Sequence, residues 1–153
     1  MGITIARENP DTETARGLIA ELVDALDHPD YPPESRHGYS VDKLIREGVH
    51  FFVMRADGQA AGCGGIQFFS GFGELKRMYV RDGFRGRGLG HALLRHLEGH
   101  ARAQDCWVLR LETGIHQTAA ITFYEHAGFS RIPPFPPYKP DPVSLFFEKR
   151  LAL

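Results

Sequence analysis

The residues best suited to chemistry form a short run of arginines and glycines, Arg85-Gly86-Arg87-Gly88-Leu89-Gly90. A segment that alternates in polarity like a strand precedes the run, and a segment with helical periodicity follows it. Glycines let the backbone adopt positive φ and approach a ligand closely, so successive N–H groups can converge on phosphate oxygens at a helix N-terminus. The arginines add cationic donors. The run therefore predicts a site for a phosphorylated ligand.

Two common phosphate-binding patterns do not fit this run. A P-loop requires Gly-Lys-Ser/Thr, and the run has neither the lysine nor the hydroxyl that would hold magnesium. A Rossmann fingerprint requires G-x-G-x-x-G early in a βαβ unit, whereas the glycine spacing here differs and antiparallel strands are expected before the run. Nucleotide hydrolysis is therefore not expected, and a pyrophosphate bound without nucleotide chemistry fits better.

The elements that must position the run follow from polarity patterns. Alternating or β-rich segments predict strands, and apolar residues at helical spacing predict helices. A fold of the mixed α/β class is expected over a single domain, 1–153, with a central, twisted, mostly antiparallel sheet of about seven strands flanked by helices. Strands are expected at residues 3–7, 49–55, 60–70, 74–80, 107–111, from 129 and at 143–148; helices are expected before residue 26, from residue 88 and at 117–127; loops are expected at 28–38 and 133–142.

The predicted strand at residues 74–80 alternates strictly in polarity. Leu75, Arg77 and Tyr79 are expected on one face, and Glu74, Lys76, Met78 and Val80 on the other. On this pattern Lys76 and Arg77 point to opposite faces of the sheet. At most one of them should therefore reach a given cleft.

Bulk composition narrows the class of protein. The 153 residues carry 18 Lys+Arg and 19 Asp+Glu, a formal net charge of −1, which gives no overall field for nucleic acid or an anionic membrane. No apolar window approaches the length of a membrane span and no signal peptide is recognisable, so a cytoplasmic protein is expected. Cys63 and Cys106 are expected to be buried reduced thiols. His96 and His100 share a helix face without a third ligand, so no metal site is predicted.

Two motifs resemble the GNAT superfamily of acetyl-CoA-dependent N-acetyltransferases. Arg85-x-x-Gly88-x-Gly90, after a strand that ends in Met78-Tyr79-Val80, resembles the acyl-CoA pyrophosphate signature. Gln117-x-x-Ala120-x-x-Phe123-Tyr124-x-x-x-Gly128-Phe129 resembles the second acyl-CoA-binding segment, although many members have Asn where Gln117 stands. The resemblance implies acetyl-CoA as co-substrate and the GNAT fold. It implies a cofactor site of Met78, Tyr79, Val80, Arg85, Gly86, Arg87, Gly88, Leu89, Gly90, Gln117 and Ala120.

The same resemblance suggests catalytic roles. Tyr124 would be the general acid that protonates the departing CoA thiolate. Glu74 lies where several relatives carry a glutamate that acts as base, and it is the first choice for the group that takes a proton from the amine. Glu112, near the end of a predicted strand, would face the same cleft and is the second choice. No covalent enzyme intermediate is needed, because an amine can attack the acetyl carbonyl directly.

The acceptor is expected to be a primary amine on a small molecule. Segments around Tyr31, Glu74 and Leu111 resemble a bacterial GNAT subgroup of undefined substrate. A cluster of cations would suit an amine that also carries a carboxylate or phosphonate; its candidates are Arg36, His37, Lys76, Arg77 and His116. Two alternatives remain open, a non-catalytic acyl-CoA sensor and a protein N-acetyltransferase. A homodimer through residues 143–148, as an exposed edge strand, is also a hypothesis.

Overall fold

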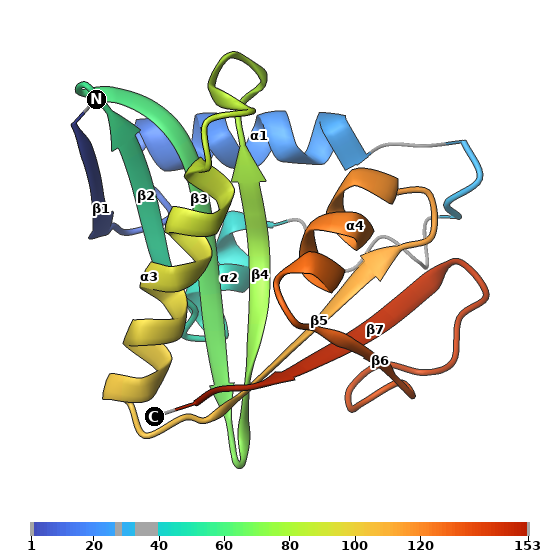
Figure 1. Ribbon diagram of the computed structural model, residues 1–153. Helices are drawn as coiled ribbons and strands as arrows, with labels where there is room; N and C mark the ends of the chain where they lie inside the picture. Colours follow the sequence, from blue (N-terminus) through green and yellow to red (C-terminus); the bar gives the residue numbers. More distant parts are fainter. Residues whose placement is uncertain (1, 27–28, 33–39, 153) are drawn as a thin grey trace.

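The strands in the described part of the chain form one sheet that is antiparallel except at a single pair of neighbours. The computed structural model describes residues 2–26, 29–32 and 40–152, so Arg36 and His37 lie outside the described residues. Seven strands lie in the order β1-β2-β3-β4-β5-β7-β6, which confirms the predicted mixed α/β fold (Figure 1). The strands are β1 (Ile3–Arg7), β2 (His50–Ala56), β3 (Gln59–Phe69), β4 (Phe72–Val80), β5 (Val108–Gly114), β6 (Ser130–Ile132) and β7 (Ser144–Arg150).

Helices cover both faces of the sheet. Helices α3 (Leu89–Ala103) and α4 (Thr118–His126) lie on one face, and α1 (Glu13–Leu26) and α2 (Val41–Arg46) lie on the other (Figure 1). The apolar stripe predicted from residue 89 is the buried face of α3, where Leu93 and Leu97 are 0% exposed. On the opposite face, α1 buries Leu18 and Ile19 against β2. No helix in the described part of the chain has the length and apolarity that crossing a membrane would require.

Strands β4 and β5 form the one parallel pair of neighbours in the sheet. Their pairing covers Gly73 with Leu109 and Glu74 with Arg110, after which the two strands diverge (Figure 1). Beyond this point β5 pairs with β7 as far as Gly114, while β4 stays with β3 as far as Val80. The sheet therefore opens between β4 and β5, and side chains from both of its faces can meet in the gap.

A β-bulge in β4 overturns the predicted alternation. Gly65 pairs with Lys76 and Cys63 with Tyr79, so β4 contains one residue more than β3 over this stretch. Arg77 has φ 58°, in the left-handed region, as expected for a residue that absorbs a bulge. The extra residue shifts the period-2 pattern. Leu75 therefore packs in the apolar core between the sheet and α3, whereas Tyr79 packs against the core between the sheet and α1. The prediction that these two residues share a face is wrong.

The prediction of residues 143–148 as an edge strand is also wrong. β7 lies between β5 and β6, and it pairs with β6 through Phe146, Phe147 and Glu148. Over these three residues β7 has a partner on each side, so this stretch is not an exposed edge. The homodimer hypothesis therefore loses the structural feature on which it was based.

Close approach of β3 to the bulge makes Gly62 sensitive to substitution. A Cβ at Gly62 would lie 2.4 Å from the backbone oxygen of Tyr79, so Gly62→Ala must move the main chain of β4. We expect it to lower the free energy of unfolding by about 1–3 kcal/mol, the usual cost of overpacking. Gly17→Ala is the matched control, because Gly17 lies in α1 with open space around it, and there alanine should stabilise by about 0.5–1 kcal/mol. Urea unfolding of the three proteins measures both effects; equal stability of Gly62→Ala and the wild type would contradict the packing described here.

Candidate active site

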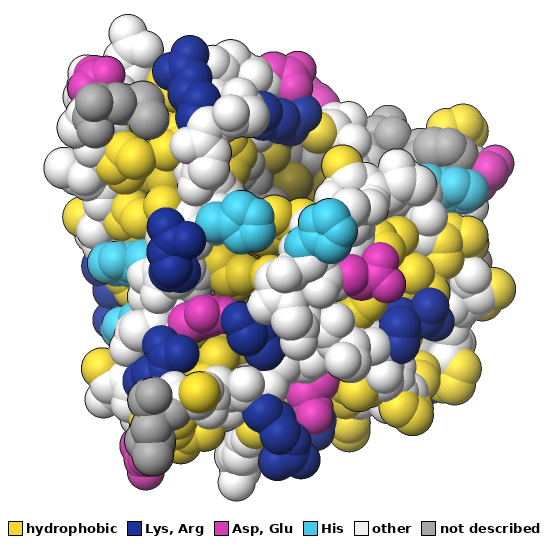
Figure 2. Space-filling model, viewed as in Figure 1, with side chains coloured by type: hydrophobic (Ala, Val, Ile, Leu, Met, Phe, Trp, Pro, Cys, Tyr) yellow, Lys and Arg dark blue, Asp and Glu magenta, His cyan; other side chains and the backbone are white. Residues whose placement is uncertain are grey.

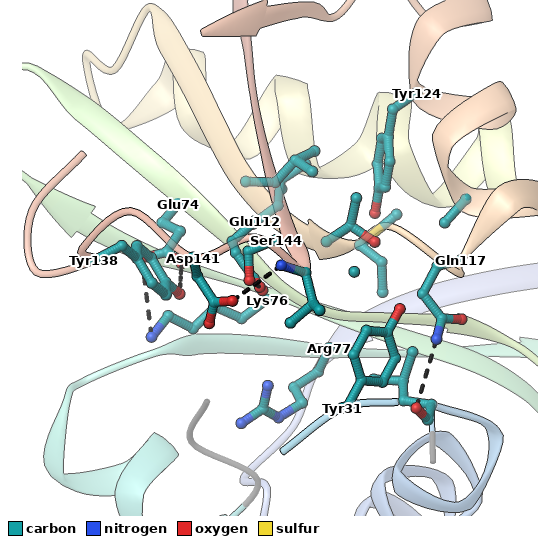
Figure 3. A pocket seen from close by; sticks show the side chains of 18 of the residues that line it. Tyr31, Glu74, Lys76, Arg77, Glu112, Gln117, Tyr124, Tyr138, Asp141 and Ser144 are labelled. Atoms are coloured by element: carbon teal, nitrogen blue, oxygen red, sulfur yellow. Dashed lines mark hydrogen bonds and ion pairs between the residues drawn. The ribbon is translucent and has the colours of Figure 1, made fainter. Parts of the chain in front are cut away.

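A cavity of about 520 Å³ occupies the gap between β4 and β5. Its wall combines residues from both faces of the sheet. Tyr124 and Met78 lie on the face of the sheet that α3 and α4 cover. Leu75 packs on that same face, so the side chain of its strand neighbour Glu74 extends from the other face. Polar residues of the wall include the ten labelled in Figure 3, which are Tyr31, Glu74, Lys76, Arg77, Glu112, Gln117, Tyr124, Tyr138, Asp141 and Ser144.

Glu74 is the most deeply buried carboxylate of the site. Its side chain is 2% exposed, and its Oε2 accepts a hydrogen bond of 2.5 Å from the Tyr138 hydroxyl. Its Oε1 has no hydrogen-bond partner among the described residues, and Lys76 Nζ is 4.0 Å away. Burial raises the pKa of Glu74, and the Lys76 charge and the Tyr138 hydrogen bond oppose that rise. A raised pKa makes the Glu74 carboxylate a stronger base than an exposed glutamate.

Glu112 lies beside Glu74 on the neighbouring strand β5. The Ser144 hydroxyl donates a hydrogen bond of 2.7 Å to Glu112 Oε2. Burial raises the pKa of Glu112 to about 7, and the charge of Glu74 contributes to the rise. The two carboxylates therefore interact electrostatically. The prediction that Glu112 faces the same cleft as Glu74 is consistent with this arrangement.

Both predicted cations of β4 line the cavity. Lys76 Nζ lies 3.6 Å from Glu47 Oε1, and the positive charge of Arg77 lowers the pKa of both Glu74 and Glu112. The prediction that at most one of Lys76 and Arg77 could reach the cleft is therefore wrong. The physical reason is the bulge at Arg77, which breaks the alternation that would have separated the two side chains.

Tyr124 enters the cavity from α4. Its side chain is 7% exposed and packs edge-on against Phe129, with 5.4 Å between ring centroids. Burial raises the pKa of Tyr124, so its hydroxyl stays protonated at neutral pH. In Figure 3 the hydroxyl end of the ring points toward the cavity, on the opposite side from Glu74 and Tyr138. A proton donor and a carboxylate base can thus act from two sides of one bound group.

The arginine-glycine run forms the turn that leads into α3. Gly86 and Gly88 have φ of 78° and 75°, which confirms the positive φ expected of these glycines. Gly88 is the N-cap of α3 and provides no side-chain cap, so the first N–H groups of the helix remain available. Arg85 is used within the turn, where its Nε donates to the Val80 carbonyl at 2.9 Å and its guanidinium pairs with Asp82. Figure 2, which has the same viewpoint as Figure 1, shows a hollow in the surface with Lys or Arg side chains along its upper rim.

The remaining predicted residues have differing environments. Ala120 and Gln117 line the cavity, but Gln117 Nε2 donates to the Leu26 carbonyl at 3.5 Å and so connects α4 to the end of α1. His116 is exposed beside the cavity wall and its Nε2 lies 3.4 Å from Asp30 Oδ2. His100 contacts His50, at 2.8 Å between ring nitrogens. No cluster of three metal-binding side chains occurs in the described ranges of the chain.

Sequence patterns missed two hydroxyl groups of the site. Tyr138 comes from the proline-rich segment 133–143, and Ser144 is the first residue of β7. A tyrosine between prolines carries no signal in polarity, and the serine looks like an ordinary strand terminus. Tertiary contacts alone bring each hydroxyl to its carboxylate.

Comparisons with known proteins agree with the geometry. The family model described as "Acetyltransferase (GNAT) family" matches residues 18–129. The "IAA acetyltransferase" of Azospirillum brasilense is 42% identical over 151 residues, which cover 97% of this chain and 98% of that protein.

Solved structures show the same fold. The putative acyl-CoA N-acyltransferase from Klebsiella pneumoniae is 41% identical, with a TM-score of 0.79 and coverage of 98% of both chains. The PaiA N-acetyltransferase from Thermoplasma acidophilum, solved in complex with coenzyme A, has a TM-score of 0.78 at 22% identity, over 98% of this chain and 99% of that chain. The chain therefore belongs to the GNAT family of acetyltransferases.

Proposed function

We propose that the protein moves an acetyl group from acetyl-CoA to the primary amine of a small molecule. The observation that carries the proposal is the cavity at the opening of the sheet. It places a buried carboxylate, Glu74, and a buried, protonated phenol, Tyr124, on two sides of one space of about 520 Å³. Direct transfer between two bound substrates needs a base and an acid in this relation.

The acetyl-CoA site is proposed along β4 and the turn into α3. Beyond Glu74 the edge of β4 no longer pairs with β5, so backbone groups of residues 78–80 can bind an extended ligand such as the pantetheine arm. The pyrophosphate would lie on the N–H groups of residues 86–90, at the positive end of the α3 dipole. The coenzyme A in the Thermoplasma structure of the same fold supports this choice of ligand.

The proposed reaction is a direct attack. The amine nitrogen loses a proton to Glu74 and forms the C–N bond with the acetyl carbonyl, which the backbone N–H near Met78 polarises. The C–S bond then breaks, and Tyr124 gives its proton to the departing sulfur. Glu112 is the second candidate for the base, because its pKa of about 7 also suits proton transfer near neutral pH.

The acceptor is proposed to carry an anionic group as well as its amine. Lys76 and Arg77 both line the cavity, on the same strand as Glu74. A guanidinium and an ammonium beside the base would attract a carboxylate or phosphonate while the base holds the amine. An amino-acid-like molecule fits this arrangement.

Binding of acetyl-CoA should raise the thermal unfolding midpoint, because a ligand of the native state stabilises it by mass action. Gly88→Asp should abolish the rise, since it adds negative charge where the pyrophosphate is proposed to bind. Gly71→Asp is the matched control, because Gly71 also has positive φ (89°) and open space around it but lies in the β3–β4 turn. Thermal scans of the three proteins with and without acetyl-CoA make the comparison. Absence of any rise in the wild type would remove the proposed cofactor site.

Glu74→Gln should lower the rate of CoA release with an amine acceptor by about 10²-fold or more, the usual loss when a general base is removed. Glu112→Gln should lose less. In the wild type, kcat/KM should fall as pH drops through the raised pKa of the base, because only the ionised carboxylate accepts a proton. A thiol-detecting assay over a panel of amino acids and other small amines measures both effects. A larger loss in Glu112→Gln would make Glu112 the base instead.

Tyr124→Phe should retain acetyl-CoA binding but lose turnover by about 10²-fold or more, since the phenyl ring keeps the packing and removes the proton donor. Thermal stabilisation by acetyl-CoA and the thiol-release assay separate these two properties. A variant as active as the wild type would show that Tyr124 supports the helix and does not donate the proton.

A further inference from the structure

Glu74 and Glu112 each accept a hydrogen bond from a hydroxyl in the same C-terminal part of the chain. Tyr138 donates to Glu74 Oε2 at 2.5 Å, and Ser144 donates to Glu112 Oε2 at 2.7 Å. Neither bond is local, because Tyr138 is 64 positions from Glu74 and Ser144 is 32 positions from Glu112. Segment 133–143 and the start of β7 therefore determine the immediate environment of both candidate bases.

The Tyr138 hydroxyl is held in position by aromatic packing. Its ring lies 5.3 Å from the Phe135 ring and 5.4 Å from the Phe146 ring, measured between centroids. Phe135 and Phe146 are themselves buried, at 3% exposure each. With its ring fixed between these neighbours, Tyr138 presents its hydroxyl to one oxygen of Glu74 (Figure 3).

The two oxygens of the Glu74 carboxylate have different surroundings. Oε2 is taken by Tyr138, while Oε1 is buried in the cavity wall and has no hydrogen-bond partner among the described residues. Burial and the nearby Glu74 charge raise the pKa of Tyr138, so the phenol remains a donor. A donor to a carboxylate favours its ionised form.

We propose that Tyr138 is a positioning residue for acetyl transfer, which fixes the orientation of the Glu74 carboxylate through Oε2 and favours the ionised form that accepts the amine proton. The catalytic part of this proposal rests on the proposed function, in which Glu74 is the base. The hydrogen bond and its effect on the ionisation of Glu74 do not depend on that function.

Other charges around Glu74 act in both directions. Lys76 and Arg77, on β4, favour the ionised carboxylate, whereas Glu47, after α2, opposes it. Glu112, on β5, interacts with Glu74 as a second acid. A measurement of the Tyr138 effect must therefore remove the coupling to Glu112.

The first experiment follows the Glu74 carboxyl directly by ¹³C NMR of protein labelled at glutamate Cδ, without any ligand. The titration is recorded in the Glu112→Gln background, with and without Tyr138→Phe, and the Glu74 signal is assigned by its loss in Glu74→Gln. We expect Tyr138→Phe to move the Glu74 titration to higher pH, because the ionised form loses a donor. An unchanged titration, with the fold intact by thermal unfolding, would overturn the proposal.

The second experiment uses the pH dependence of kcat/KM with acetyl-CoA and the best small amine from the screen. Tyr138→Phe should lose about tenfold at pH 6 and recover toward wild-type activity at pH 9, since a carboxylate that has lost a charged hydrogen bond needs a higher pH to ionise. Ser144→Ala is the matched comparison, because it removes the hydroxyl that donates to Glu112. We expect it to leave unchanged the acid limb of the profile, which is the pH range over which kcat/KM falls on acidification.

The outcomes separate the two proposals. An equal loss for Tyr138→Phe at every pH would assign Tyr138 a structural role only and overturn the inference. A shift of the acid limb in Ser144→Ala but not in Tyr138→Phe would also overturn it and would make Glu112 the base. Absence of turnover by the wild type with every amine would contradict the proposed function, while the NMR titration would still test the Tyr138 hydrogen bond.

Discussion

The divergence of β4 from β5 is the constraint on which the rest of the site depends. Two parallel pairs, Gly73 with Leu109 and Glu74 with Arg110, join the two halves of the sheet before the strands separate. A continuous sheet would have filled this space with ladder hydrogen bonds and separated its two faces. The opening instead makes a cavity that Tyr124 enters from the α4 side and Glu74 from the opposite side.

The bulge at Arg77 complements this opening. One extra residue in β4 brings Lys76 and Arg77 to the same cavity and returns Met78 to the α3 core. Because β3 approaches so closely here, position 62 has no room for a Cβ. A backbone irregularity in β4 and a glycine in β3 thus determine together which charges surround Glu74.

Burial and specific partners have opposite effects on the pKa values of Glu74 and Glu112. Burial raises the pKa of both Glu74 and Glu112 and so favours their protonated forms, which cannot accept a proton. Nearby cations and one hydroxyl donor for each carboxylate oppose that effect. The site therefore contains two carboxyl groups with raised pKa values, about 7 for Glu112, and each has a hydrogen-bond donor that favours its ionised form.

Local features of the protein follow from short-range patterns in its amino-acid sequence. The arginine-glycine turn, the apolar stripe of α3 and the strand periodicities are short-range patterns, so the sheet-based α/β fold and the positive φ of Gly86 and Gly88 could be predicted. Tertiary structure alone decided what depends on residues far apart in the chain. The bulge at Arg77, the interior place of β7, and the hydrogen bonds of Tyr138 and Ser144 to the carboxylates result from pairing and packing between distant segments, and polarity patterns carry no information on such contacts.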